Sequence, residues 1–589
     1  MANVGLDFGT TYTSCFLWDE TEQKFKNLLS QDPKNRAQAS LVLYVGGHPL
    51  YGNRAVTNLL AHTLDDQKNR IFSGFKMLLH DNDQLKDRGY DENGAFCPKE
   101  ITKSYLKEMI KIAAQKAKNK IGKIVIGIPV LWKDDKSTLK GYEVLKEILS
   151  EILKELPGII DDYQFYSEPE LACAYFAWNY REKMIKEKSK NPDFNGFMQV
   201  IDYGGGTLDI NFCKVSQRSG NCEITVSLGG GDGENDRQKG MLGKAGLAYI
   251  ENVVKKIAED KYKNITNQEK YKLLQTLESN LIEGKQDIDN NFDLARSKKE
   301  KDRINKLHFD PIGIMDNPIT YGHLYEVFME TFGDEDMSNK NGERDDNKVL
   351  VKALNELEHK KRILRKTDDT LPNINDDFKL ALTGGFCDFF LTKQAIYDYY
   401  EVGSPDDKKI KGMDMEEEGS RFAIALGAAL VAAGKVKINK INPFTLGIQK
   451  EEKNGTQKRW VAFQYGKDME PEKPKYVLDP NENLEVIFQG SDIATLFYDS
   501  DGSGKYEAKM VNDEYKNLFK VPGNPLKDIY LIGFSINEKE DLKLHFQKVR
   551  EISINEHEKV GEPISIELPK LHQLLRDPLE AVGVFKEKI

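Results

Sequence analysis

The sequence has few cysteines and no paired-cysteine motif. Six cysteines occur in 589 residues, and no two of them form a C-x-x-C pair. This scarcity argues against a zinc site and against a disulfide framework. We therefore expect mostly buried thiols and a cytoplasmic protein. The six residues are Cys15, Cys97, Cys173, Cys213, Cys222 and Cys387.

Long apolar runs and an excess of positive charge are also missing. No stretch approaches the roughly 18 consecutive apolar residues that a membrane-spanning helix needs, and the first residues read as a strand rather than a secretory signal. The formal net charge is −10. This value argues against general binding to nucleic acid or to an anionic membrane surface.

The length and composition predict a folded chain of several domains. The core of one domain rarely grows beyond roughly 250–300 residues, and this chain has 589. Hydrophobic residues make up 39% of the chain and aromatic residues 10%, which suits globular rather than disordered structure.

Two similar glycine turns are the most informative feature present. In each, an apolar run ends in an acid, and glycine and new β-prone residues follow: Asp7 with Gly9, and Asp202 with the run 204–206. Alone, either copy reads equally well as an ordinary glycine hairpin. Together they predict a duplicated domain that clamps a nucleotide, because glycine frees backbone N–H groups for an anion and aspartate can hold Mg²⁺. Neither G-x-G-x-x-G nor G-x-x-x-x-G-K-[ST] fits these turns, which disfavours a dinucleotide or Walker loop.

Further candidate residues end predicted strands or interrupt apolar stretches. Glu168 ends the strand at 165–167, and Gly384 and Gly385 follow the strand at 378–383. Lys76 lies within the apolar stretch 71–79, where it either snorkels to the surface or enters a site. The run 229–233 is interpreted as a flexible glycine loop.

The chain changes character near residue 435. From there to about residue 568, short strands alternate with turns, and their spacing predicts a β-sandwich. A short helix is expected over residues 570–579.

The order of these motifs resembles the DnaK-like, seventy-kilodalton heat-shock chaperone family. The two glycine turns look like the family's phosphate hairpins, which actin and sugar kinases share. The segment 441–448, Ile-Asn-Pro-Phe-Thr-Leu-Gly-Ile, is similar to the start of the family's peptide-binding β-domain and singles out the chaperones. The resemblance covers residues 1 to about 568. Its other motifs are the adenosine motif at 382–385, the connecting segments at 126–129 and 167–169, and a small-residue helix around 425–429.

The resemblance implies both the domains and the ligands. It implies an α/β actin-like (duplicated ribonuclease-H-like) ATPase domain over residues 1–434, a linker over 435–440, an all-β sandwich over 441–568, and a short helix and tail over 569–589. ATP or ADP and Mg²⁺ are the implied cofactors, with K⁺ as a further candidate. The implied partners are unfolded or extended polypeptide, or one dedicated protein, together with co-chaperones. We expect neither nucleic acid nor a membrane as a partner.

The resemblance also assigns the site residues. Catalysis is assigned to Lys76, Glu168, Asp202, Thr207 and Asp209, with Lys76 placed to contact the γ-phosphate and the attacking water. Asp7 and Asp202 would hold Mg²⁺ through its waters, and Pro129 would carry the nucleotide state outward. Cofactor contacts are assigned to Asp7, Gly9, Thr10, Thr11, Tyr12, Gly204, Gly205, Gly206, Glu283, Gly384, Gly385 and Asp388.

The sequence departs from the family pattern at the base end and after the ATPase domain. Asp388 and Gln286 match the two arginines that usually sandwich the adenine, a change that would weaken base binding or alter its selectivity. The segment 243–246 lacks the acid of its motif, and the basic run 435–440 replaces an acidic, apolar linker. No helical lid is identified, so a bound peptide should leave faster.

We therefore expect a lidless relative of these chaperones that binds and hydrolyses ATP. The alternative is a non-hydrolysing, nucleotide-gated adaptor for one fixed partner. A small-molecule kinase is less favoured, because the C-terminal β-domain has no counterpart there.

Overall fold

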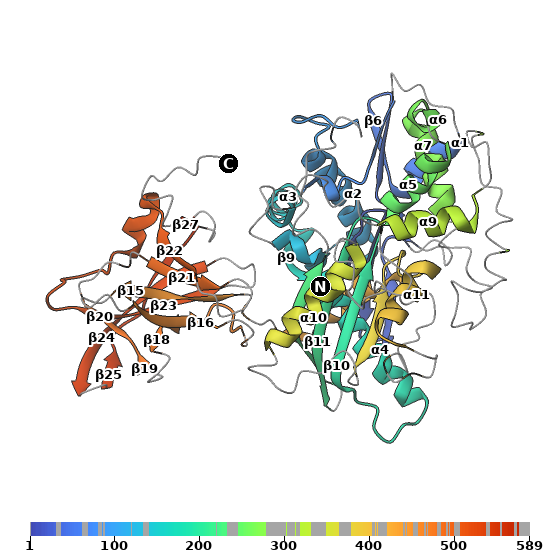
Figure 1. The fold of residues 1–589 in the computed structure, drawn as a ribbon. Coiled ribbons are helices and arrows are strands. Elements are labelled where there is room, and N and C mark those ends of the chain that lie inside the picture. The colour runs from blue at the N-terminus through green and yellow to red at the C-terminus, as the bar shows by residue number, and fades with distance from the viewer. Residues whose placement is uncertain are drawn as a thin grey trace, which may run out of the picture. The chain divides into compact units, whose positions relative to one another are not determined.

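The chain divides into two compact units. The first covers Met1–Lys361 and Pro372–Ile438, and the second covers Arg362–Leu371 and Asn439–Ile589. Figure 1 shows the first as mixed α/β and the second, coloured orange to red, as mostly strands. The computed structural model describes residues 2–30, 37–61, 69–79, 85, 89–118, 120–133, 141–218, 221–231, 246–258, 260–278, 302, 313, 319–331, 349–364, 378–402, 407, 409, 421–439, 442, 444–451, 457–464, 467, 469–479, 484–489, 493, 495–499, 507–536, 542–553, 556–569 and 574–576.

The first unit begins with a sheet in the strand order β3-β2-β1-β8-β9. Strands β1 and β2 form the expected antiparallel hairpin, in which Asp7 is opposite Ser14. Strands β8 and β9 continue the sheet in parallel. The bounds are β1 Ala2–Phe8, β2 Tyr12–Asp19, β3 Lys24–Asn27, β8 Ile121–Ile128 and β9 Ile160–Ser167, and β4 (Gln38–Ala39) pairs with β2.

The second sheet repeats this plan in the order β13-β10-β11-β12-β14. Its hairpin, β10 with β11, places Asp202 opposite Asp209, and β13 runs parallel to β10. The bounds are β10 Asn195–Tyr203, β11 Leu208–Arg218, β12 Asn221–Gly231, β13 Lys379–Thr383 and β14 Val436–Asn439.

Two expectations about this sheet were wrong. Gly229 to Gly231 are not part of a loop; they pair with β11, and Gly231 lies opposite Asp209. Most of the expected linker is strand β14, because Val436 and Ile438 bury their side chains in the core.

Two helices with small residues pack against the sheets. Helix α13 (Ala423–Ala432) contacts β1, β2 and β8, and helix α4 (Glu168–Lys186) contacts β10 and β11. The helices also contact each other at Gly427, where a Cβ atom would overlap the carbonyl oxygen of Leu171. Gly5 allows β1 an equally close approach, because its Cβ would overlap the α13 backbone at Ala425 and Ala429. The expected small-residue helix therefore fixes the position of the first hairpin.

Other helices surround these layers. Helices α2 and α3 share a core with β1, β8 and β9, while α1 covers a small sheet of order β6-β5-β7. None of the helices within the described ranges has the length and apolarity to cross a bilayer. The remaining bounds are β5 Leu41–Val45, β6 His48–Tyr51, α1 Gly52–Ala61, β7 Asn69–Ser73, η1 Met77–Leu79, α2 Pro98–Lys116, η3 Val130–Lys133, α3 Gly141–Glu155, α5 Gly246–Ala258, α6 Asp260–Lys263, α7 Asn267–Glu278, α9 Tyr321–Thr331, α10 Val349–Leu364 and α11 Phe390–Tyr399.

The second unit consists of two antiparallel sheets around one apolar core. One sheet has the order β19-β18-β16-β15-β21-β22-β27, and the other has β17-β23-β24-β25 with β20 and β26 at its sides. Leu446 and Leu496 of the first sheet share the core with Ile532 and Phe546 of the second. The bounds are β15 Thr445–Glu451, β16 Gln457–Phe463, β17 Lys475–Tyr476, β18 Leu478–Asp479, β19 Leu484–Glu485, β20 Ile487–Gln489, β21 Thr495–Asp499, β22 Glu507–Val511, η6 Asp513–Phe519, β23 Ile529–Ile536, β24 Leu542–Ser553, β25 Glu556–Lys559, β26 Ile564–Glu567 and β27 Leu575–Arg576.

The expected C-terminal helix was wrong at residues 575 and 576. Leu575 and Arg576 form strand β27, which pairs with Val511 and Met510 of β22. The other residues of the expected helix, apart from residue 574, lie outside the described ranges.

Candidate functional site

The two hairpin turns close in the same way. The Gly9 N–H donates to the Tyr12 carbonyl oxygen at 3.0 Å, and the Gly204 N–H donates to the Thr207 carbonyl oxygen at 3.0 Å. In both turns the bond spans three residues and follows directly after the strand that carries the aspartate. The sequence duplication is therefore also a duplication of turn geometry.

The turns also lie against each other. A Cβ atom on Gly206 would overlap the Thr10 hydroxyl, and one on Gly205 would lie 2.6 Å from the Thr11 hydroxyl. A third turn joins them at Gly384, whose φ of +83° favours glycine. Its Cβ would lie 2.5 Å from the Asp202 carboxylate. Three glycine turns that are distant in the sequence thus meet at the ends of β1, β10 and β13.

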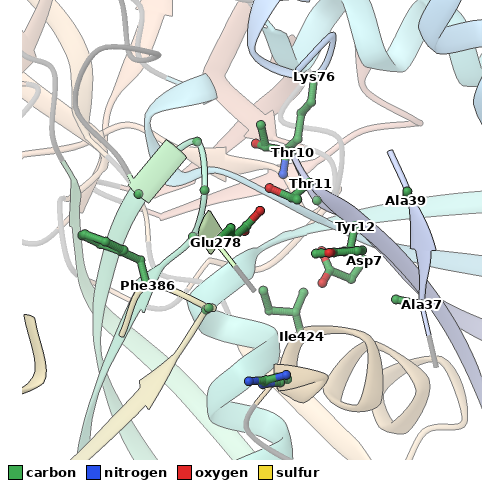
Figure 2. A pocket seen from close by; sticks show the side chains of 18 of the residues that line it. Asp7, Thr10, Thr11, Tyr12, Ala37, Ala39, Lys76, Glu278, Phe386 and Ile424 are labelled. Atoms are coloured by element: carbon green, nitrogen blue, oxygen red, sulfur yellow. The ribbon is translucent and has the colours of Figure 1, made fainter. Parts of the chain in front are cut away.

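A pocket of about 620 Å³ opens between these turns. Figure 2 shows Lys76 and Thr10 at one end of it, with Phe386 and Ile424 toward the other. It is lined by Asp7, Gly9, Thr10, Thr11, Tyr12, Ala37, Ala39, Asn53, Val56, Thr57, Lys76, Glu168, Asp202, Gly204, Gly205, Gly206, Thr207, Gly246, Gln275, Glu278, Gly384, Gly385, Phe386, Arg421, Phe422 and Ile424.

Lys76 does not snorkel to the surface. Its ammonium group is buried and forms an ion pair with the Glu168 carboxylate, whose side chain is also buried. Glu168 is the first residue of α4, and its place is set by a capping box in which the Glu170 side chain accepts a hydrogen bond from the Ser167 N–H at 2.9 Å. Helix α4 thereby holds the partner of Lys76 at the pocket.

Three carboxylates lie together at this ion pair, and Glu168 is one of them. One oxygen from each of Glu168, Asp202 and Asp209 can be chosen so that all lie within 4.8 Å of one another. Asp209 does not itself line the pocket; one of its oxygens accepts a hydrogen bond from the Val130 N–H at 2.7 Å. With Asp7, the cluster holds four carboxylates around one ammonium group. Such a surplus of oxygen ligands suits a hard divalent cation such as Mg²⁺.

Burial and mutual repulsion shift the pKa values of the groups in this cluster. Burial and the charge of Glu168 raise the pKa of Asp7 to about 7, against the opposing effect of Lys76. Burial and the charges of Glu168 and Asp209 raise the pKa of Asp202 well above its ordinary value. For Lys76, burial favours a lower pKa, but Glu168 and Asp7 outweigh it and the pKa is raised. The lysine therefore stays protonated, but its single positive charge is not enough to neutralise the four carboxylates around it.

The end of the pocket beyond the glycine turns has a different chemistry. Phe386 and Ile424 lie toward it (Figure 2), and Phe422 and Arg421 also line the pocket. Asp388, an expected cofactor contact, does not line the pocket; its carboxylate lies 3.7 Å from Nε of Arg421. Glu283, another expected contact, lies outside the described residues.

Comparisons with known proteins identify the relatives of this chain. No protein-family model matches it. Its curated relatives include a ribosome-associated molecular chaperone of Zygosaccharomyces rouxii, which is 24% identical over 238 residues, 36% of this chain and 34% of the relative. The heat shock cognate 70 kDa protein 3 of Dictyostelium discoideum is 24% identical over 264 residues, 40% and 38% of the two chains. The chaperone protein DnaK of Mycoplasmoides gallisepticum is 24% identical over 238 residues, 39% and 34%.

The chain is a divergent relative of the seventy-kilodalton heat-shock chaperones. It spans about a third of the length of the curated relatives that it matches.

Several pocket residues of this chaperone relative were not predicted from the sequence. Arg421 stands before a small-residue helix, and no local pattern marks it as a site residue. Gln275 and Glu278 lie on α7, where the helical pattern alone does not distinguish a pocket face from a solvent face. Phe386 directly follows the predicted double glycine, and this position in the sequence could have marked it as a pocket residue.

Proposed function

We propose that the first unit binds a nucleoside triphosphate with Mg²⁺ and hydrolyses it, and that the second unit binds extended polypeptide. One observation carries the first part: two glycine turns of the same geometry abut across a pocket lined by Asp7, Glu168, Asp202 and the buried Lys76. Glycine turns present backbone N–H groups to phosphate oxygens, and the carboxylates supply the ligands for a hydrated cation.

The proposed roles follow from the positions of the side chains. The turn residues Thr10, Thr11 and Thr207 would hold the phosphates, and Asp7 and Asp202 would hold Mg²⁺ through its waters. Lys76, kept protonated by Glu168, would neutralise charge on the transferred phosphoryl group. When bound, Mg²⁺ would neutralise phosphate charge as well. Glu168 and Asp209 would accept hydrogen bonds from water and so orient the attacking molecule.

An actin-like, duplicated ribonuclease-H-like arrangement is the proposed architecture of this unit. The strand order β3-β2-β1-β8 matches the order β12-β11-β10-β13, with an antiparallel hairpin and one parallel neighbour in each. The contact of α4 with α13 at Gly427 supports the proposal, because each helix packs against one of the two sheets.

The second unit is proposed to be a β-sandwich that binds polypeptide. Two sheets enclose one core, and β19 stands at the end of its sheet order with Leu484 exposed. The neighbouring Ile487 of β20 is also exposed. Edge strands with exposed apolar side chains can pair with an extended peptide. The relatives are named as chaperones, one of them as ribosome-associated. We therefore propose extended polypeptide clients and co-chaperones as partners.

Calorimetric titration of the full chain with Mg·ATP tests the first part. Gly206→Ala should weaken binding at least about tenfold, because its Cβ would displace the Thr10 hydroxyl. Gly322→Ala is the matched control: its Cβ would lie 3.6 Å from its nearest neighbour, the Thr320 hydroxyl, and it sits in α9 away from the pocket. A wild-type chain that does not bind Mg·ATP would overturn the proposal.

A peptide array probed with and without ATP tests the second part. Binding of many extended apolar peptides, with release on addition of ATP, is the expected result. Binding of a single partner without a nucleotide response would instead support a dedicated adaptor.

A further inference from the structure

Arg421 reaches the nucleotide pocket from an unexpected segment. It lies just before Phe422, the N-cap residue of α13, and it lines the pocket together with Phe422 and Ile424. The glycine turn at 384–385, which leads into Phe386, also lines the pocket. Figure 2 shows Ile424, three residues further along the chain than Arg421, apart from Lys76 at the phosphate end, which puts the segment of Arg421 at the end that remains for the nucleoside.

Arg421 pairs with the residue that stands where the resemblance implies an arginine. In the family that the chain resembles, an arginine is expected at position 388, but this chain has Asp388 there. Asp388 lies outside the pocket lining, and its carboxylate is 3.7 Å from Nε of Arg421. In this chain the cation of the pair is Arg421.

The chemistry of this cation suits a nucleobase. A guanidinium group is planar, stays charged, and stacks on aromatic faces, which an ammonium group does less well. A carboxylate beside the guanidinium group restricts its orientation. An apolar side chain three residues further along the chain, Ile424, supplies the dry surface that a base also needs.

We propose that Arg421 is the base-stacking side chain of this pocket and that Asp388 positions it. This inference rests on the proposed nucleotide-binding function. The ligand class is a nucleoside triphosphate, and recognition is by stacking on the ring of the base. Because stacking does not read base edges, ATP and GTP should depend on Arg421 to a similar extent.

Calorimetry with three Mg²⁺-loaded probes tests this proposal: ATP, GTP and inorganic tripolyphosphate. Arg421→Ala should weaken ATP and GTP about tenfold each and leave tripolyphosphate within about twofold. Arg421→Lys should resemble Arg421→Ala, because it keeps the charge and loses the plane. Asp388→Asn should cause a smaller loss of the same kind, about threefold. Circular dichroism confirms that each variant is folded.

The outcomes separate this proposal from the function on which it rests. A wild-type chain that binds neither ATP nor tripolyphosphate overturns the nucleotide-binding function itself. Unchanged ATP binding in Arg421→Ala overturns the stacking role alone. An equal loss for tripolyphosphate shows that Arg421 acts on phosphates, and a loss for GTP only shows that it reads base edges; either result overturns stacking. Wild-type ATP affinity in Asp388→Asn overturns the positioning role.

Discussion

Replacing Asp7 by asparagine should stabilise the ligand-free first unit while it destroys cation binding. Asp7 faces Glu168 and Asp202 in a cluster short of positive charge, and its pKa is raised from 3.8 to about 7. An acid with a raised folded-state pKa contributes stability that is complete below its unfolded pKa and is lost as the pH rises through the folded value. Wild type therefore loses stability between about pH 4 and pH 7, and Asp7→Asn removes that loss.

The size of the effect follows from the shift. At about 1.4 kcal/mol per pKa unit, a rise from 3.8 to about 7 corresponds to about 4 kcal/mol as an upper limit. Asp7 is partly open to water in the pocket, which screens its charge. We expect Asp7→Asn to exceed wild type by about 2 kcal/mol in unfolding free energy at pH 8.

Urea unfolding followed by tryptophan emission measures this difference from pH 4 to pH 8, without Mg²⁺ or nucleotide. Both proteins should carry Trp460→Phe, so that the emission comes from the first unit alone. Asp162→Asn, on an exposed position of β9, is the matched control. Equal stability of wild type and Asp7→Asn at pH 8 would refute the reasoning. The tryptophans that remain are Trp18, Trp132 and Trp178.

Three further predictions address packing, release and pH. Gly427→Ala should lower the melting temperature sharply in a thermal scan, because its Cβ would overlap the Leu171 carbonyl oxygen. Gln268→Ala should speed nucleotide release several-fold in stopped-flow chase experiments, because its buried amide joins α7 to the Leu59 carbonyl oxygen of α1 at 2.8 Å, and both helices contribute residues to the pocket lining. His545, buried between two serine hydroxyls, has a pKa lowered by burial and by a nearby lysine. The second unit should therefore lose stability as the pH falls below about 6.5, and His545→Gln should flatten that dependence in urea unfolding.

The hairpins were predictable because their signals are local. An apolar run, an acid and a glycine turn specify strand, turn and strand within a dozen residues, and Asp7 and Asp202 occupy the expected strand ends. The meeting of Thr10 with Gly206 spans almost 200 residues, and only the duplication of the motif indicated it. Arg421 had no such duplicate and could not be found.

The wrong expectations arose where burial or strand pairing outweighed the local sequence signal. Val436 and Ile438 alternate with lysines, a strand pattern that the basic charge of the segment obscured. Gly229 to Gly231 read as a loop because glycine disfavours strands in isolation, yet pairing with β11 holds them extended. Leu575 has apolar neighbours at helical spacing, and pairing with β22 overrides that preference.

The central claim is that Lys76 serves phosphoryl transfer, and phosphate release from Mg·ATP tests it most directly. Wild type should release phosphate only with Mg²⁺, and both Lys76→Ala and Lys76→Met should slow release at least about a hundredfold. Two variants are needed, because loss of one partner of a buried ion pair costs about 3–5 kcal/mol and one variant can fail to fold. Lys116→Ala, at an exposed lysine of α2, should match wild type. Equal phosphate release by wild type and a folded Lys76 variant would contradict the account.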